Sequence, residues 1–211
     1  MCTDPLGPFT MRGVEQIPWA YDLFMDVVER FGLHDWRRLL AGRARGRTLD
    51  LGCGTGRNLP LFGSDSQVVG LELDLYLLAT ARRRAPTLPL IVGRAEELPF
   101  RDAVFDSVVS SLVFCSVSDP AAGLAEAARV LAPAGELRML EHVRSDGRLL
   151  GWFQDTIQPG WTWLAGGCHP NRRTEETVEA AGFLIERYEL PGRTTLRCFV
   201  ARAPRKAPAV D

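Results

Sequence analysis

Several features that would point to a particular environment are scarce or absent in this sequence. No apolar run reaches the roughly 20 residues that a membrane-spanning helix needs, and no secretory signal peptide is visible. Lys206 is the only lysine, and the formal net charge of −1 gives no reason to expect nucleic acid or an anionic membrane as a partner. We therefore expect a cytoplasmic protein without a membrane anchor, and the sequence leaves its oligomeric state open.

The cysteines follow neither a disulfide pattern nor a CxxC metal-binding pattern. They are odd in number, which favours a reducing compartment, and they stand at Cys2, Cys53, Cys115, Cys168 and Cys198. A metal site built on Cys115 and Cys168 would need a third ligand that the sequence does not reveal. We therefore expect small packed thiols and no metal.

A strand followed by alternating glycines dominates the first third of the chain. Residues 48–58 read TLDLGCGTGRN. Gly52, Gly54 and Gly56 allow a sharp turn and a close approach of a ligand to the backbone. A helix that begins near Arg57 would direct its free N–H groups at the same ligand. The stretch predicts the first βα turn of a nucleotide-binding α/β domain.

The spacing of these glycines separates two classes of ligand. A dinucleotide fingerprint reads GxGxxG, whereas this turn reads GxGxG and has Arg57 in place of the third glycine. Asp50 would repel a pyrophosphate but suits a ligand that carries a cation. The turn therefore resembles motif I of the class I methyltransferases, which bind S-adenosylmethionine (SAM), and an NAD-dependent oxidoreductase is disfavoured.

Strand and helix patterns alternate along the remainder of the chain. The length suits one domain. Strands are expected at 48–51, 67–72, 90–93, 105–112, 136–141, 183–190 and 195–201. This alternation predicts an α/β fold with a doubly wound, mostly parallel, seven-stranded Rossmann-like sheet. We expect a single domain at 1–203, with an N-terminal helical lid at about 15–40, a substrate-side insertion at about 144–175 and a disordered tail at 204–211.

Cofactor residues are expected where the strands end. Glu72 lies twenty positions after Gly52, the offset of the carboxylate that binds ribose hydroxyls in nucleotide-binding folds. Arg94 occupies the position where many SAM methyltransferases carry an adenine-binding aspartate, so Ala95 or Glu96 would serve instead. The expected cofactor-binding residues are Asp50, Gly52, Cys53, Gly54, Gly56, Asn58, Glu72, Leu73, Ala95, Glu96, Ser111 and Leu112.

Three later stretches narrow the resemblance. They are SLVFCSV at 111–117, LEHV at 140–143, and the run from Trp152 through GGCHPNR to Arg172. Together they resemble the thiol S-methyltransferase-like branch of the type 11 class I methyltransferases. This resemblance implies SAM as methyl donor, S-adenosylhomocysteine as product, and a small lipophilic acceptor, most simply a thiol. N- or C-methylation of a phospholipid or quinone-like molecule is the alternative, as is SAM binding without catalysis.

Candidates for the chemistry lie around the expected acceptor site. A thiol reacts as its thiolate and has a pKa of about 8.5, so a base would help. His142, at the end of the fifth strand, is the candidate base, with a structural histidine as the alternative. Tyr21 either leans over the ligand or only packs its helix. Trp152, Trp161 and His169 are expected to contact the acceptor.

Arg172 is harder to assign from the sequence. It would either anchor an acidic group of the substrate or pair with Glu141 or Asp155, and the internal pair is favoured.

Overall fold

The computed structural model describes residues 17–188 and 195–203. The predicted disordered tail at 204–211 lies outside these ranges. Within them, no helix combines the length and the apolar character needed to cross a membrane.

Seven strands form one sheet in the order β3-β2-β1-β4-β5-β7-β6. Their bounds are β1 Gly46–Leu51, β2 Ser66–Glu72, β3 Leu90–Val92, β4 Phe105–Ser111, β5 Leu131–His142, β6 Leu184–Tyr188 and β7 Leu196–Arg202. Strands β1 to β5 pair in parallel, whereas β7 runs antiparallel to both β5 and β6. The predicted mostly parallel, seven-stranded sheet is confirmed.

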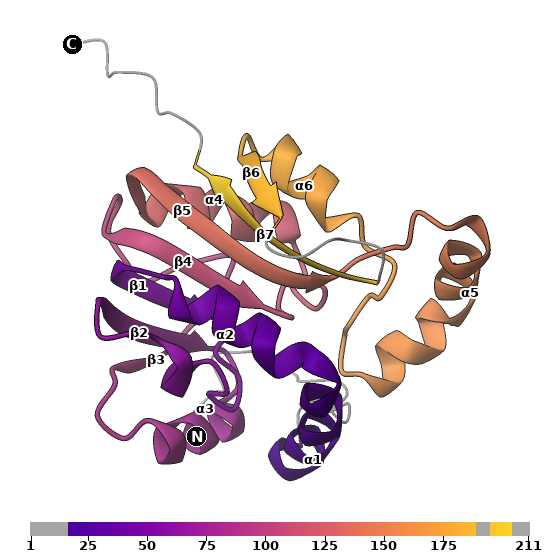
Figure 1. The fold of residues 1–211 in the computed structure, drawn as a ribbon, viewed down its shortest axis with the longest axis horizontal. Helices are drawn as coiled ribbons and strands as arrows, with labels where there is room; N and C mark the ends of the chain where they lie inside the picture. The colour runs from indigo at the N-terminus through magenta and orange to yellow at the C-terminus, as the bar shows by residue number, and fades with distance from the viewer. Residues whose placement is uncertain (1–16, 189–194, 204–211) are drawn as a thin grey trace, which may run out of the picture.

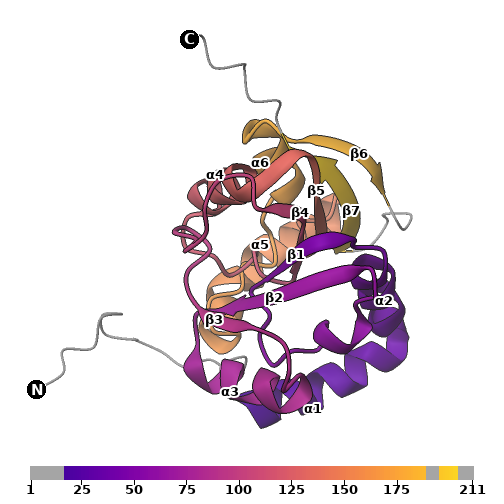
Figure 2. The same cartoon turned by 90° about the vertical axis from the view of Figure 1, so that its left-hand side faces the viewer.

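Helices cover both faces of this sheet. They are α1 Pro18–Val28, α2 His34–Gly42, α3 Leu75–Arg84, α4 Pro120–Val130, α5 Arg148–Leu164 and α6 Thr174–Ala180, with a π-helical kink at Glu29–Leu33 between α1 and α2. Figure 2 shows α4 and α6 on one face and α2 on the other, as a doubly wound fold requires. In Figure 1, α5 stands out at one side of the molecule.

One local prediction is wrong. After β1 the chain forms only a 3-10 turn, Leu59–Leu61, rather than an α-helix from Arg57. Gly52, Gly54 and Gly56 all adopt positive φ, so the turn itself is not helical, and the first regular structure after it begins only at Leu59. The segment expected as a substrate-side insertion contains helix α5, which tolerates Pro159 near its end.

Packing of the hydrophobic core holds the carboxyl ends of the central strands in place. Apolar side chains of β1, β4, β5, α4 and β7 are fully buried against one another, among them Leu51, Val108, Leu124, Leu137 and Phe199. Burial of such a side chain is worth about 1.5–3 kcal/mol. The carboxyl ends of β1, β2, β4 and β5 therefore meet at one rigid edge of the sheet.

Candidate functional site

A cavity of about 340 Å³ opens at this carboxyl edge. Its walls come from the glycine turn after β1, the loops after β2, β3 and β4, helix α1, and one side chain of α5. Ligands of open α/β sheets bind at this position.

Most of the predicted site residues line the cavity. Those predicted to bind the cofactor are Gly52, Cys53, Gly54, Asn58, Glu72, Leu73, Ala95, Glu96, Ser111 and Leu112. Those predicted for the chemistry or the acceptor are Tyr21, His142 and Trp161.

Four predicted residues lie elsewhere. Asp50 is fully buried behind Asn58, and Gly56 packs against α3, where an added Cβ would come within 2.9 Å of the Ala81 Cα. Trp152 is 65% exposed on the outer side of α5. His169 lies beside the cavity lining and donates its backbone N–H to the Cys115 carbonyl at 2.8 Å.

The glycine turn leaves space where a side chain would otherwise project. Gly54 has φ +55°, and a Cβ added there would meet no atom within 4 Å. Gly52 has φ +68°, and its added Cβ would collide with the Val113 side chain at 2.6 Å. The turn is therefore open to a ligand at Gly54 and closely packed at Gly52.

Backbone donors hold the Glu72 carboxylate at the cavity wall. One oxygen accepts from the Gly54 N–H at 2.9 Å, and the other accepts from the N–H groups of Leu73 at 2.8 Å and Asp74 at 2.9 Å. Burial raises the pKa of Glu72, while these three hydrogen bonds oppose that rise. The carboxylate is thus fixed before any ligand arrives.

A buried polar network lies beneath the same wall. Arg37 is 3% exposed and donates to the Asn58 amide oxygen at 2.9 Å and to the Ser111 hydroxyl at 3.0 Å. Asn58 in turn donates to Asp50 at 3.0 Å. Burial raises the pKa of Asp50 to about 7, although the Asn58 hydrogen bond and the Arg37 charge lower it. Sequence reasoning missed Arg37, which resembles any arginine of an amphipathic helix.

Arg57 ties α1 to the glycine turn. It pairs with Asp22 at 3.1 Å and with Glu29 at 2.9 Å, and it also contacts Asp26. Asp22 additionally accepts from the Thr55 hydroxyl at 2.8 Å. The residue that replaces the third glycine of a dinucleotide fingerprint therefore anchors the helix whose side chains cover the cavity.

Two cysteines and a histidine lie close together at the cavity, which Cys115 and His142 line. The ligating atoms of Cys115, His142 and Cys168 all lie within 4.8 Å of one another, and His142 Nδ1 is 3.9 Å from Cys168 Sγ. Cys115 lowers the pKa of Cys168 to about 4, with a smaller contribution from His142 and against the effect of burial. The sequence argument against a metal assumed that a third ligand was missing, and His142 supplies one.

Glu141 and Arg172 hold the loop that carries Cys115. The Glu141 carboxylate accepts from the N–H groups of Val113 and Phe114 at 3.0 Å and of Cys115 at 3.3 Å. Arg172 donates to the Val117 carbonyl at 2.7 Å and to that of Phe114.

The favoured internal pair is wrong for Asp155, whereas the Arg172 guanidinium does interact electrostatically with Glu141. Asp155 binds Arg144 at 2.8 Å instead, and Arg172 serves backbone carbonyls.

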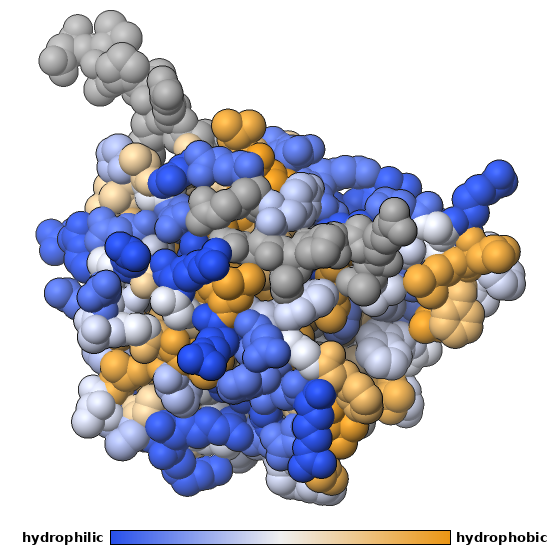
Figure 3. Space-filling view, in the orientation of Figure 1, coloured by the Kyte–Doolittle hydropathy of each residue, from blue (hydrophilic) through white to orange (hydrophobic). Residues whose placement is uncertain are grey.

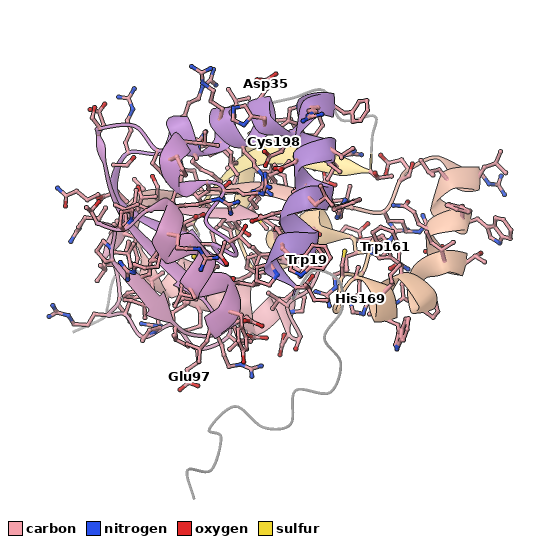
Figure 4. The ribbon with its side chains drawn as sticks, turned by 90° about the horizontal axis from the view of Figure 1, so that it is seen from below. Trp19, Asp35, Glu97, Trp161, His169 and Cys198 are labelled. Carbon is pink, nitrogen blue, oxygen red and sulfur yellow. The ribbon has the colours of Figure 1, made fainter. Side chains whose placement is uncertain are left out.

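Apolar surface surrounds the helices that contribute to the cavity. Figure 3 shows it gathered over α1 and α5. Its exposed members are Trp19, Leu23, Phe24, Val27, Leu149, Leu150, Trp152, Phe153, Trp163 and Leu164. Figure 4 shows Trp161 between α5 and the body of the protein, in keeping with its place on the cavity wall.

Comparison with known proteins points to one family for the middle of the chain. Residues 49–139 match the family described as "Methyltransferase domain". A demethylmenaquinone methyltransferase of Renibacterium salmoninarum is 37% identical over 126 residues, which cover 57% of this chain and 53% of the relative. Thiol S-methyltransferase TMT1B of Rattus norvegicus is 34% identical over 143 residues, which cover 64% of this chain and 59% of the relative. The matches thus span less than two thirds of either relative.

A solved structure shares the fold along almost the whole chain. One chain of the complex between the Haloferax volcanii Trm112 methyltransferase activator and a methyltransferase aligns with a TM-score of 0.70 at 21% identity, covering 93% of this chain and 100% of that chain.

Proposed function

Since residues 49–139 carry a methyltransferase domain, we propose that this protein transfers a methyl group from SAM to a small lipophilic acceptor, with a thiol as the first choice. The observation that best supports this proposal is a single cavity. Its lining includes the glycine turn and Glu72 as well as His142, Cys115 and Trp161. Such a cavity holds a donor at one end and an acceptor at the other. Residues 1–203 would then act as one domain with α1 as its lid.

The cavity meets the requirements of SAM. The space at Gly54 accepts a ligand close to the backbone, and the fully buried Asp50 holds Asn58, which lines the cavity. In the proposed complex Glu72 binds the ribose hydroxyls, Asp50 acts with Asn58 toward the ammonium group, and Ala95 and Glu96 lie toward the adenine. SAM supplies an electrophilic methyl group when bound.

The protein contributes alignment and a dry site. An in-line displacement at a methyl carbon needs little covalent assistance, so proximity and exclusion of water supply most of the acceleration. Helix α1, anchored by Arg57, covers the cavity with Tyr21, Phe24 and Met25. We assign His142 to the acceptor end, where it would favour the thiolate.

Two acceptor classes have support. The apolar surroundings, Trp161 and the similarity to TMT1B favour a lipophilic thiol. The comparable similarity to a demethylmenaquinone methyltransferase supports C-methylation of a quinone-like molecule, and N-methylation of a phospholipid belongs to the same alternative. We propose a cytoplasmic location, in keeping with the odd number of cysteines and the lack of CxxC spacing in the sequence.

The proposal is tested in two steps. Calorimetry measures SAM binding, and an acceptor panel of an alkyl thiol, a demethylated quinone and a primary amine is then analysed by mass spectrometry for methylated products. We expect SAM to bind and the thiol to be methylated fastest. A faster reaction of the quinone would select the alternative, and SAM binding without any product would indicate a binding protein.

A further inference from the structure

The Cys115–His142–Cys168 cluster has the composition of a zinc site with an open position. Two thiolates, one imidazole and an exchangeable fourth ligand form a known catalytic zinc environment. Soft sulfur donors combined with imidazole select zinc over hard cations. The cluster also lies at the cavity, because Cys115 and His142 line it while Cys168 is buried behind them.

The spacing of the three groups suits a tetrahedral ion. Zinc bonds of about 2.3 Å to sulfur and 2.0–2.1 Å to nitrogen place tetrahedral ligand atoms about 3.6–3.8 Å apart. His142 Nδ1 and Cys168 Sγ are 3.9 Å apart, and all three ligand atoms fall within 4.8 Å of one another. Small rotations of the side chains therefore suffice to close the site.

The backbone around the cluster is fixed by hydrogen bonds from distant segments. Glu141 binds the loop of Cys115, and the Thr162 hydroxyl of α5 donates to the Cys168 carbonyl at 3.0 Å. Gln154 donates to the carbonyls of Val143 at 3.0 Å and Pro170 at 2.8 Å, which joins the end of β5 to the loop that carries Cys168. A metal site needs such outer support to orient its ligands.

We propose that Cys115, His142 and Cys168 bind one Zn²⁺, and that its fourth position takes the acceptor thiol. The second half of this statement rests on the proposed methyl transfer, whereas the first half stands without it. Zn²⁺ is held by two thiolates, which neutralise its charge, and a proton still carried by either cysteine is released to solvent on binding.

The methyl transfer to the acceptor thiol then proceeds in two steps. The thiol R–SH replaces water on the ion, gives its proton to solvent and is held as a thiolate. Its sulfur forms a bond to the methyl carbon while the carbon–sulfur bond of the sulfonium breaks, and that electron pair stays on the sulfur of S-adenosylhomocysteine. The bound acceptor gives the site one negative charge, which Arg172 offsets because its guanidinium interacts electrostatically with both cysteines.

Metal content tests the site directly. The reduced full chain is loaded with Zn²⁺, dialysed, and measured for zinc per chain by plasma mass spectrometry, in parallel with Cys168→Ala and His142→Ala. We expect one zinc per chain in the wild type and almost none in either variant after dialysis, because each variant lacks a direct ligand of the ion. Cys198→Ala is the matched control, since Cys198 is a buried cysteine that lies well apart from Trp161 and His169 in Figure 4.

Cobalt substitution of the wild type needs no variant and reports on the acceptor. Bound Co²⁺ should give sulfur-to-metal charge-transfer absorption, and octanethiol should change this spectrum while octanol does not. A reduced wild type that takes up no zinc, or a Cys168→Ala protein that keeps it, overturns the metal site. A spectrum that octanethiol leaves unchanged overturns the acceptor role.

SAM calorimetry on the same samples separates this proposal from the proposed function. Normal SAM binding and thiol methylation by protein stripped of zinc would overturn the acceptor role of the ion and leave the methyltransferase intact. Zinc binding without SAM binding would overturn the methyltransferase and leave the metal site intact.

Discussion

Asn58 donates a hydrogen bond of 3.0 Å to one oxygen of Asp50, while the other Asp50 oxygen is buried and finds no hydrogen-bond partner within the described ranges. This half-satisfied carboxylate lies under the glycine turn, and its position has consequences for stability as well as for ligand binding. An unpaired buried charge is costly, which is why the pKa of Asp50 rises to about 7.

Asp50→Asn should change how stability depends on pH. The folded-state pKa of about 7 exceeds the ordinary aspartate pKa of 3.8, so protonation favours the folded state. This contribution is complete below about pH 4 and is lost as the pH rises through 7, with a total of about 4 kcal/mol. Urea unfolding of the ligand-free protein at pH 4 to 8 should therefore show Asp50→Asn gaining stability relative to the wild type as the pH rises.

Asp35→Asn controls for substitution of an exposed aspartate. Unfolding curves of wild type and Asp50→Asn that stay parallel between pH 4 and 8 would show that Asp50 is ionised throughout.

Glu72→Ala should weaken SAM binding by at least about tenfold. Charge-assisted hydrogen bonds to hydroxyls are worth roughly 1.5–3 kcal/mol each, and the Glu72 carboxylate is already positioned at the cavity wall. Calorimetry measures the loss, with Glu97→Ala as the matched control, because Glu97 is exposed on the neighbouring loop. Equal dissociation constants for Glu72→Ala and the wild type would remove Glu72 from the site.

Gly54→Val should abolish SAM binding. The substitution fills the open space at the turn and imposes a branched side chain on a φ of +55°. Gly32→Val separates strain from blockage, since Gly32 also has positive φ and open space but lies off the cavity. We expect Gly32→Val to lose stability and keep its SAM affinity. A folded Gly54→Val protein with normal affinity would place the ligand elsewhere.

Trp161→Ala should raise the Michaelis constant for lipophilic thiols at least about tenfold, because a large apolar contact is worth about 1.5–3 kcal/mol. SAM affinity should stay nearly constant. Trp152→Ala is the matched control, since it removes an indole from the exposed side of the same helix. Indistinguishable kinetics of the two variants would show that Trp161 does not contact the acceptor.

The sequence predicted which residues of the glycine turn line the cavity better than it predicted which residues of α5 do. Gly52, Gly54 and Glu72 are recognisable because local spacing places them at strand ends that a parallel sheet always brings together. Trp152 and Trp161 could not be separated without knowing that α5 is a helix, where nine residues at about 100° each put them on opposite sides.

Contacts between residues far apart in the sequence could not be predicted either. Cys168 meets His142 across 26 positions through a loop geometry that no single-sequence pattern encodes. Arg37 likewise reaches Asn58 and Ser111 only because α2 packs over the sheet.

The most direct test of the account is transfer of a deuterated methyl group from labelled SAM to an alkyl thiol, followed by mass spectrometry of both products. The wild type should form the deuteromethyl thioether and S-adenosylhomocysteine in equal amounts, while Gly54→Val forms neither. The account would be contradicted by a wild-type protein that binds SAM but yields no deuteromethylated product from the thiol, the quinone or the amine.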